Sequence, residues 1–440
     1  MPRDAVKRVP GGLFMENKTS SGSQELHPST RVLTQGFDPR LSVGSARPAV
    51  FRSSTYVFST PEAAERAFNI GAGRAQRSKD EQVDLIYSRF NHPNAEILEE
   101  QLVPLERGAE TALVFNSGMA AIMTAFLGLL SPGQTVVYTA PIYGGTLQFL
   151  RDFLPRWGVH TIAAPAGKGE TLDEAIRSAK NLGMVLLETP VNPTLVMSDI
   201  RRACATVATL KPNDDGSRPL VMVDNTMLGP AFQHPLPLGA DLVVYSGTKY
   251  LGGHSDLLAG VILGNDPVVM GKLRRSRSLY GNILQPDECW MLNGRLPTVG
   301  LRMNRQSKNA QRIAEALHGH PKIDRVIYPT LFDDPEQVAI YKSQCDFPGG
   351  MFSIVLKGGK TAAFDFLRHI TIGKNAVSLG GVETLACHPN STTHSGFTQE
   401  EFAATGMSEG LVRISVGIED WRDLLADFEQ ALEQTRYDAG

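Results

Sequence analysis

The stretch that organises this chain is Tyr245-Ser246-Gly247-Thr248-Lys249-Tyr250-Leu251-Gly252-Gly253-His254, which continues an apolar run from Asp241 that is typical of a buried strand. Ser246 and Thr248 offer two hydroxyls on one side of an extended segment. Lys249 follows among small, weakly charged residues, where poor solvation lowers the pKa of an amine. Such an amine can bond covalently to an aldehyde while the hydroxyls hold a phosphate. The stretch indicates a site for a phosphate-bearing aldehyde; the alternative is a solvated lysine at a strand end.

Short apolar strands alternate with helices on both sides of this stretch. Strands are predicted over residues 111–115, 134–138, 159–163, 184–187, 220–223, 241–245 and 258–263. Helices are predicted over residues 117–130, 145–156 and 198–210, and from a capping box that starts at Thr171. This alternation is typical of an α/β fold with a mostly parallel sheet covered on both faces. Ligands of such sheets bind beyond the carboxyl ends of the strands.

The pattern changes after about Pro297. A helix over 300–318, strands over 351–356 and 411–416, and an amphipathic helix over 421–432 predict a smaller α+β domain. Residues 1 to about 50 are polar and rich in Ser, Gly and Pro, which is typical of an arm or tail, and residues 71–84 are expected to form a mobile loop. We therefore predict an N-terminal arm and loop over 1–92, a large domain over 93–297 and a smaller domain over 298–440.

The composition excludes several classes of protein. The formal net charge of the 440 residues is -3, so no basic field invites nucleic acid. The four cysteines are far apart and form no CxxC pair, which argues against a zinc site and a disulfide framework. No apolar run reaches the ~18 residues that span a bilayer. The first residues lack the apolar core of a signal peptide, so we expect a cytoplasmic protein without a membrane partner.

Other polar residues follow predicted strands at the same edge of the sheet. Ser117-Gly118-Met119 opens a helix, where backbone N–H groups favour an anion, although an ordinary turn has the same pattern. Asp224 ends an apolar strand, so its carboxylate needs a cationic or hydrogen-bonded partner; the alternative is a helix N-cap. The Tyr143 ring follows another strand and suits stacking on a flat cofactor or packing in the core.

Three further sets of residues are candidates for binding anions or polar groups. Asn192 stands between two prolines, which hold it stiffly either as a donor or in a turn. Arg413 lies inside an apolar strand and requires an anion, either a substrate carboxylate or a structural partner. Tyr87 and Arg89 are two residues apart in an extended segment, so both point to one face. They clamp an anion or pack on each other.

Several of these motifs together resemble the Cys/Met-metabolism family of pyridoxal phosphate enzymes. The motifs are Tyr87-Ser88-Arg89, Ser117-Gly118-Met119, Tyr143-Gly144-Gly145-Thr146, Glu188-Thr189-Pro190, Val223-Asp224-Asn225-Thr226, Ser246-Gly247-Thr248-Lys249-Tyr250 and Ser378-Leu379-Gly380-Gly381-Val382-Glu383-Thr384. The resemblance covers roughly residues 50 to 435, and the segments 393–398 and 411–420 are most similar to methionine gamma-lyase. The family also includes cystathionine gamma-synthase, cystathionine gamma-lyase and the O-acylhomoserine sulfhydrylases, and its fold is similar to that of aspartate aminotransferase.

The resemblance implies pyridoxal 5'-phosphate as the cofactor and assigns roles around it. Lys249 would hold the cofactor covalently and move protons, Asp224 would pair with the pyridine nitrogen, and Tyr143 would stack on the ring. The residues implied to bind the cofactor phosphate within one chain are Gly118, Met119, Ser246 and Thr248.

The resemblance also implies a site shared between chains. Tyr87 and Arg89 would reach the cofactor phosphate of the neighbouring subunit, and such enzymes usually form homotetramers of two catalytic dimers. Asn192, Ser378 and Arg413 would face the substrate carboxylate or the cofactor oxygen.

Three positions depart from the family's pattern. Gly145 stands where methionine gamma-lyases typically carry a cysteine, and Arg277-Ser278 replaces their Lys-Asp pair. Val377 stands where cystathionine gamma-lyases tend to carry a glutamate. The expected activity is therefore gamma-elimination on a gamma-substituted L-amino acid such as methionine, homocysteine or an O-substituted homoserine like canavanine. The alternatives are gamma-replacement on an O-acylhomoserine and a protein that binds the cofactor or a partner without catalysis.

Overall fold

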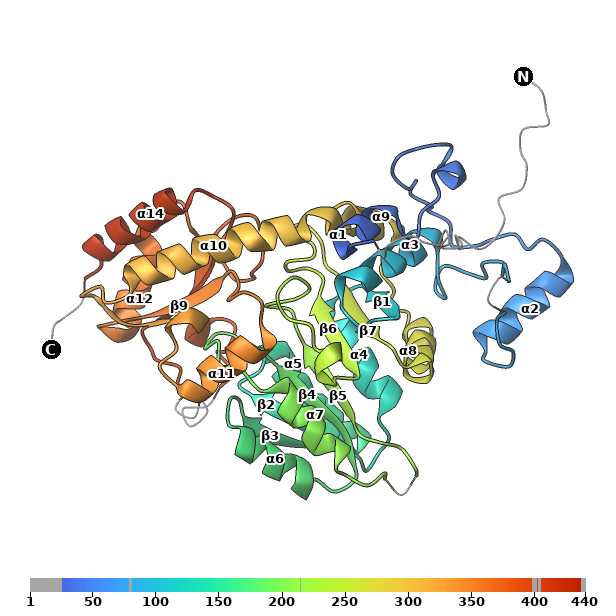
Figure 1. Ribbon diagram of the computed structural model, residues 1–440, viewed down its shortest axis with the longest axis horizontal. Helices are drawn as coiled ribbons and strands as arrows, with labels where there is room; N and C mark the ends of the chain where they lie inside the picture. The colour runs from blue at the N-terminus through green and yellow to red at the C-terminus, as the bar shows by residue number, and fades with distance from the viewer. Residues whose placement is uncertain (1–25, 79–80, 214, 398–401, 403–404, 437–440) are drawn as a thin grey trace.

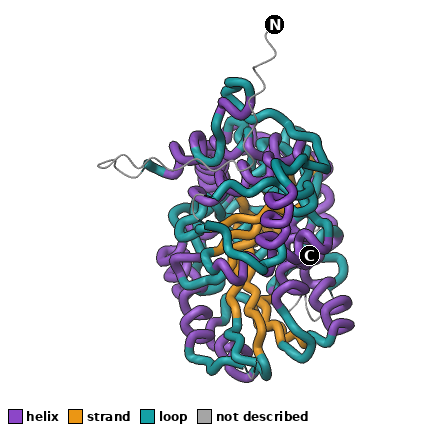
Figure 2. The backbone as a smooth tube through the Cα atoms, turned by 90° about the vertical axis from the view of Figure 1, so that its right-hand side faces the viewer, coloured by secondary structure: helices purple, strands orange, loops and turns teal. Residues whose placement is uncertain are grey.

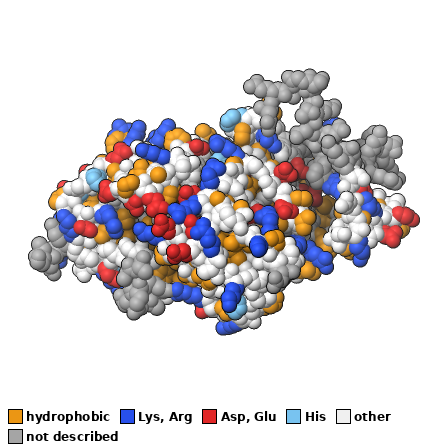
Figure 3. Space-filling model, turned by 60° about the horizontal axis from the view of Figure 1, so that its bottom comes forward, with side chains coloured by type: hydrophobic (Ala, Val, Ile, Leu, Met, Phe, Trp, Pro, Cys, Tyr) orange, Lys and Arg blue, Asp and Glu red, His pale blue; other side chains and the backbone are white. Residues whose placement is uncertain are grey.

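The computed structural model of the chain describes residues 26–78, 81–213, 215–397, 402 and 405–436. Two sheets form the centres of two lobes, and the long helix α10 (Val299–Leu317) runs from one lobe to the other (Figure 1). In the turned view the strands lie inside and the helices surround them (Figure 2). No helix in these described ranges is both long and apolar enough to cross a membrane. Acidic and basic side chains are interspersed on the face shown in Figure 3, in line with the formal net charge of -3.

The large sheet has seven strands in the order β1-β7-β6-β5-β4-β2-β3. Their bounds are β1 (Thr111–Phe115), β2 (Thr135–Ala140), β3 (His160–Pro165), β4 (Leu182–Glu188), β5 (Leu220–Asp224), β6 (Leu242–Ser246) and β7 (Gly260–Gly264). The strands from β6 to β3 pair in parallel, and β7 alone runs antiparallel to its neighbours β6 and β1. The mostly parallel sheet that the sequence predicts is confirmed.

Helices cover both faces of this sheet because its strands are apolar on both sides. One face is covered by α4 (Gly118–Leu129), α5 (Gly144–Gln148) and α8 (Pro267–Tyr280). The other is covered by α3 (Pro93–Leu102), α6 (Gly169–Ser178), α7 (Ile200–Ala208) and α9 (Pro286–Asn293). The carboxyl ends of the parallel strands are left open to a ligand.

The small sheet lies in the C-terminal lobe and has the strand order β10-β11-β12-β9-β8. Its strands are β8 (Ile323–Ile327), β9 (Met351–Leu356), β10 (Lys374–Asn375), β11 (Leu385–Cys387) and β12 (Leu411–Ser415). Its core is shared with α10, α12 (Gly359–His369) and α14 (Trp421–Gln434), whereas α11 (Pro335–Gln344) lies towards the large sheet. The predicted α+β character of this part of the chain is present.

The structure differs from the sequence-based expectation at three places. The prediction that a capping box at Thr171 starts a helix is wrong. The chain turns at Gly167, with φ of +71°, and α6 begins already at Gly169 without a side-chain cap. The helix expected over 145–156 is α5 followed by a π turn and a 3-10 turn that ends at Trp157.

The third difference concerns the N-terminal residues. Within the segment expected to be an arm, α1 (Pro28–Thr34) buries Val32 in the core of its own chain. Residues 1–25 of that segment lie outside the described residues. In contrast, α2 (Pro61–Gly71) stands apart from the body of the chain (Figure 1).

Candidate active site

A cavity of about 190 Å³ lies at the carboxyl ends of β4, β5 and β6 and at the N-terminus of α4. Most of the predicted site residues line it: Gly118, Met119, Tyr143, Asn192, Asp224, Ser246, Thr248 and Lys249. Topology explains why residues so far apart in sequence meet, since the carboxyl ends of parallel strands share one edge of the sheet.

Lys249 follows β6 and is partly buried at the floor of this cavity. Its Nζ donates a hydrogen bond of 3.0 Å to Ser378 Oγ, which comes from the small-sheet lobe. Burial, with the nearby positive charge of Arg413, lowers the pKa of Lys249 to about 8, although the charge of Asp224 opposes the shift. At pH 7 about a tenth of the amine is therefore neutral, far more than for an ordinary lysine, and a neutral amine is a nucleophile.

The loop that carries Ser378 is held on the lysine by backbone geometry. Ser378 has a backbone φ of +89°, a region that residues other than glycine rarely adopt. Two residues on, Gly380 has φ of +76°, and a Cβ there would lie only 2.7 Å from the backbone N of Tyr250. Only glycine lets the loop approach Lys249 so closely, so the site is built from both lobes.

Asp224 lies partly buried near Lys249, and its contacts close a turn. Asp224 Oδ1 accepts hydrogen bonds from the backbone N–H of Thr226 at 3.0 Å and from its hydroxyl at 2.6 Å. Thr226 Oγ1 in turn accepts from the backbone N–H of Ser246 at 2.9 Å. Burial raises the pKa of Asp224, and the bonds from Thr226 and the charge of Lys249 oppose that rise. No helix begins at Asp224, so the helix N-cap alternative is wrong.

Glu188 is a site residue to which the sequence reasoning gave no role of its own. It ends β4 directly beside Asp224 in the sheet register, and it lines the same cavity. Its two carboxyl oxygens accept the backbone N–H groups of Tyr143 at 2.8 Å and Asn192 at 3.0 Å. One carboxyl group thus fixes the backbone of two predicted ligand-facing residues. The sequence did contain a signal for Glu188, because it is an acidic residue at the end of an apolar strand, as Asp224 is.

The proton of Glu188 gives a testable pH dependence. Burial, and after it the negative charge of Asp224, raises the pKa of Glu188 to about 8. The folded protein therefore keeps a proton that the unfolded chain releases above about pH 4.5, and stability falls as pH rises from there to about 8. Glu188→Gln removes this titration. We expect the variant to gain about 1–3 kcal/mol relative to the parent between pH 5 and pH 9 in urea unfolding of the ligand-free proteins. Parallel stability curves for the two proteins would contradict the assignment.

The start of α4 forms a narrow cradle with the end of β6. Ser117 caps α4 by accepting the N–H of Ala120, which leaves the first helical N–H groups facing the cavity. A Cβ on Gly118 would lie 3.1 Å from Ser246, so the glycine permits this close approach. Thr248 Oγ1 exchanges hydrogen bonds with the backbone of Ala259 at 3.1 and 3.4 Å, which fixes its position. The cradle suits a small anion such as a phosphate.

Arg413 in β12 is 2% exposed and lies next to the loop that carries Ser378. Its guanidinium donates to Asn192 Oδ1 at 3.2 Å and to the carbonyl of Ser378 at 2.5 Å, and its Nε has no partner. Among the residues that the structure describes, no carboxylate forms an ion pair with it. The structural ion pair considered from the sequence is therefore not found there, and a buried cation remains to receive an anion.

Tyr87 and Arg89 are exposed and do not line the cavity of their own chain. The Arg89 guanidinium carbon lies 5.9 Å from the centre of the Tyr87 ring, so the two side chains share a face as predicted. Arg89 Nη1 also donates to the carbonyl of Ser278 at 2.7 Å.

The three departures from the family pattern lie in different surroundings. A Cβ on Gly145 would come within 2.8 Å of the Tyr143 ring, so the ring as placed here requires glycine. Arg277 is buried at 1% exposure in an ion pair with Glu99 and does not line the cavity. Val377 is 52% exposed.

Comparisons with known proteins agree over nearly the whole chain. The model of the family described as Cys/Met metabolism PLP-dependent enzyme matches residues 29–433. The L-methionine gamma-lyase of Pseudomonas deceptionensis is 39% identical over 406 residues, which cover 92% of this chain and 97% of the relative. The cystathionine gamma-lyase of Sus scrofa is 36% identical over 347 residues, which cover 79% of this chain and 83% of the relative. The structure of cystathionine gamma synthase from Xanthomonas oryzae pv. oryzae in complex with cystathionine matches with a TM-score of 0.82 and 31% identity over 93% of this chain and 99% of that one.

Proposed function

The chain belongs to the Cys/Met metabolism family of pyridoxal-phosphate-dependent enzymes, and from this premise we propose that it catalyses gamma-elimination on a gamma-substituted L-amino acid. The observation that carries the proposal is that the Lys249 amine and the Arg413 guanidinium both form hydrogen bonds with Ser378. The Lys249 amine contacts its hydroxyl, and the buried Arg413 guanidinium contacts its carbonyl without an anionic partner among the described residues. Because both groups contact Ser378, an α-amino acid whose carboxylate binds Arg413 would bring its α-carbon near the Lys249 amine.

The enzyme is a pyridoxal-phosphate-dependent lyase of the trans-sulfuration type, and the residues of the cavity fit that cofactor. The cradle that glycine permits at Gly118 and Ser246 suits the phosphate, and the carboxyl group of Asp224 at the end of β5 suits a protonated pyridine nitrogen. When bound, the cofactor withdraws electrons from the carbons next to the substrate's amino group. Lys249 would hold it covalently, and Met119 and Thr248 would complete the phosphate contacts.

The remaining steps depend on proton movement by the chain's own groups. Gamma-elimination requires a proton to be removed at two successive carbons, and Lys249, with its lowered pKa, is the base within the cavity. Tyr143 lines the same cavity, where its ring would stack on the cofactor and its hydroxyl would assist proton transfer at the leaving group. Asn192 and Arg413 would hold the substrate carboxylate while these transfers take place.

The second candidate is gamma-replacement, in which a thiol or another nucleophile attacks the activated gamma-carbon. It is favoured by the likeness to the cystathionine gamma synthase structure and to metB from Corynebacterium glutamicum, which has a TM-score of 0.81 and 32% identity over 93% of this chain and 98% of that one. Gly145 also departs from the cysteine that is typical of methionine gamma-lyases.

A substrate panel separates the two reactions. Methionine, homocysteine, canavanine, cystathionine and O-acylhomoserines would each be supplied with and without a thiol, and keto acid and thioether would be measured. We expect 2-oxobutanoate and ammonia from at least one gamma-substituted amino acid without any added thiol. Thioether formation with no keto acid would reject elimination in favour of replacement, and no product from any substrate would reject both.

We further propose that the enzyme is a cytoplasmic homotetramer of two catalytic dimers, with each site shared between two chains. The observation that supports sharing is the position of Arg89, which is exposed and lies outside the cavity of its own chain. The cofactor phosphate carries about two negative charges, and the cradle supplies only neutral donors. A guanidinium from the partner chain would provide the missing counter-charge.

Hybrid dimers test this sharing directly. Arg89→Ala should weaken cofactor retention, since a charge-assisted hydrogen bond is worth about 1.5–3 kcal/mol. When Arg89→Ala and Lys249→Ala chains are mixed and allowed to exchange, one of the two sites in each hybrid carries both defects and the other carries neither. We expect activity to recover to about half of that of the parent dimer. A verified hybrid without recovery would mean that Arg89 acts within its own chain or away from the cofactor.

A further inference from the structure

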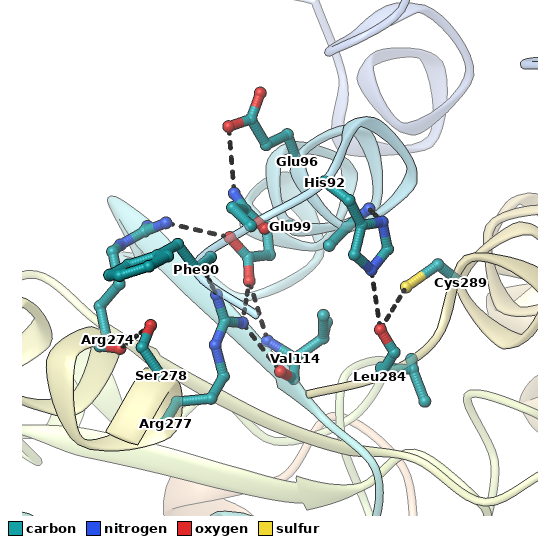
Figure 4. Close-up of polar contacts among 12 residues, drawn as sticks. Phe90, His92, Glu96, Glu99, Val114, Arg274, Arg277, Ser278, Leu284 and Cys289 are labelled. Atoms are coloured by element: carbon teal, nitrogen blue, oxygen red, sulfur yellow. Dashed lines mark hydrogen bonds and ion pairs between the residues drawn. The ribbon is translucent and has the colours of Figure 1, made fainter. Parts of the chain in front are cut away.

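A buried ion pair connects the segment that carries Arg89 to the sheet edge that leads into α4. Glu99 on α3 and Arg277 on α8 are 5% and 1% exposed, and Arg277 Nη1 lies 2.5 Å from Glu99 Oε1. Figure 4 shows the two side chains facing each other, with Phe90 on one side of the pair and Val114 on the other. Neither member lines the cavity of the active site.

On one side, the pair holds the edge strand β1. Glu99 Oε1 accepts the backbone N–H of Val114 at 3.1 Å, and Arg277 Nη1 donates to the carbonyl of Val114 at 2.8 Å. Because β1 is the outermost strand of the large sheet, these two backbone groups have no neighbouring strand to pair with. The ion pair supplies both partners, and the chain passes from Val114 through Ser117 into α4 at the cavity.

On the other side, α8 and the loop after it hold residues 89–92. Arg277 Nη2 donates to the carbonyl of Phe90 at 3.4 Å, and Arg89 Nη1 donates to the carbonyl of Ser278, the next residue of α8, at 2.7 Å. His92 Nε2 contacts the carbonyl of Leu284 at 2.8 Å. The backbone that follows Arg89, at Phe90 and His92, and the Arg89 side chain itself are therefore held against α8 and the loop after it, and Arg277 supplies one of these contacts.

We propose that the Glu99–Arg277 ion pair is a positioning element that sets the direction of Arg89, and so serves the active site of the partner subunit rather than only that of its own chain. The proposal rests on the proposed sharing of sites. Its physical reason is geometric: the planar guanidinium has enough donors to hold Glu99, Val114 and Phe90 at once, whereas a lysine amine at the same place is a single point of charge.

Hybrid dimers with a single working lysine separate the two chains' contributions. One chain carries Lys249→Ala, so the only covalently loaded site is the one built on the other chain, with Arg89 supplied by the Lys249→Ala chain. In the first hybrid, Arg277→Lys is placed on the Lys249→Ala chain and can act only through the donated segment. In the second, it is placed on the chain that keeps Lys249 and can act only through that chain's own strand β1 and helix α4.

The measured quantity is the rate at which borohydride-trappable cofactor is lost on dilution, which reports on the working site without requiring turnover. We expect the first hybrid to lose cofactor about 10-fold faster than a hybrid that carries Lys249→Ala alone. The matched control is Arg274→Lys on the same chain, because Arg274 reaches Glu99 at 3.5 Å from a half-exposed position and, among the described residues, donates no hydrogen bond to Phe90 or Val114. We expect this control to match the parent hybrid.

A first hybrid that retains cofactor as the parent hybrid does would overturn the proposal, whatever the second hybrid shows. If Arg277→Lys chains do not assemble, Glu99→Gln, which keeps the size of the side chain, replaces it in both hybrids with the same expectation. The outcome is distinguishable from failure of the shared site itself. In that case the Arg89→Ala and Lys249→Ala chains would not complement each other, although the parent hybrid would keep its one working site.

Discussion

Lys249→Ala is expected to abolish the covalent retention of the cofactor and nearly all turnover. The amine is the only lysine that lines the cavity among the described residues, and burial with the charge of Arg413 lowers its pKa to about 8. Loss of a positioned acid–base group alone costs about 10²–10⁴-fold in rate, and loss of the covalent link adds to that. Borohydride reduction followed by peptide mapping measures the link, and keto acid formation measures the turnover.

The matched control is Lys272→Ala, which removes an exposed lysine on α8 far from the cavity lining. This variant should retain both the reducible link and the parent activity. The assignment of Lys249 is wrong if its alanine variant forms a reducible adduct at another lysine and turns over normally.

Asp224→Ala is expected to lower kcat by about three orders of magnitude, a loss of about 4 kcal/mol of transition-state stabilisation, while the fold survives. The carboxylate would keep the pyridine nitrogen of the cofactor protonated, and without it the electron-withdrawing strength of the ring falls. Thr226 donates two hydrogen bonds to one oxygen of Asp224 and Lys249 lies nearby, and both favour the ionised carboxylate against the rise in pKa that burial causes. Steady-state kinetics at saturating cofactor measure the effect.

Asp199→Ala provides the comparison for a purely structural aspartate. Asp199 caps α7 by accepting the N–H of Arg202 at 2.9 Å, and its loss should cost about 1 kcal/mol of stability with normal kcat. If Asp224→Ala behaves in the same way, with a small melting shift and normal turnover, Asp224 has no role at the cofactor.

Much of the large domain could be predicted from the chain itself. Runs such as Leu220–Asp224 and Leu242–Ser246 are short, apolar and followed by polar residues, and that local pattern is sufficient to predict buried parallel strands. Because parallel strands end at one edge, the pattern also predicted that Asp224, Ser246 and Lys249 would lie together. These inferences need only periodicity and the alternation of strands with helices.

Other features depended on contacts that are distant in sequence. The start of α6 was missed because a glycine turn, rather than the Thr171 side chain, sets where that helix begins. The role of Glu188 emerged only when its carboxyl oxygens were seen to accept the N–H groups of Tyr143 and Asn192.

Local pattern and one rule of sheet topology are sufficient to place the strands of the large sheet, the residues at their carboxyl ends and the lysine among them. Long-range packing, in contrast, brings the lysine amine to Ser378 of the other lobe and buries Arg413 without a carboxylate in an ion pair with it among the described residues. Lys249 and Ser378 are separated by 129 positions. A contact over that distance is fixed by the packing of two lobes and by a backbone that only glycine at position 380 permits, and no local pattern in the chain encodes either.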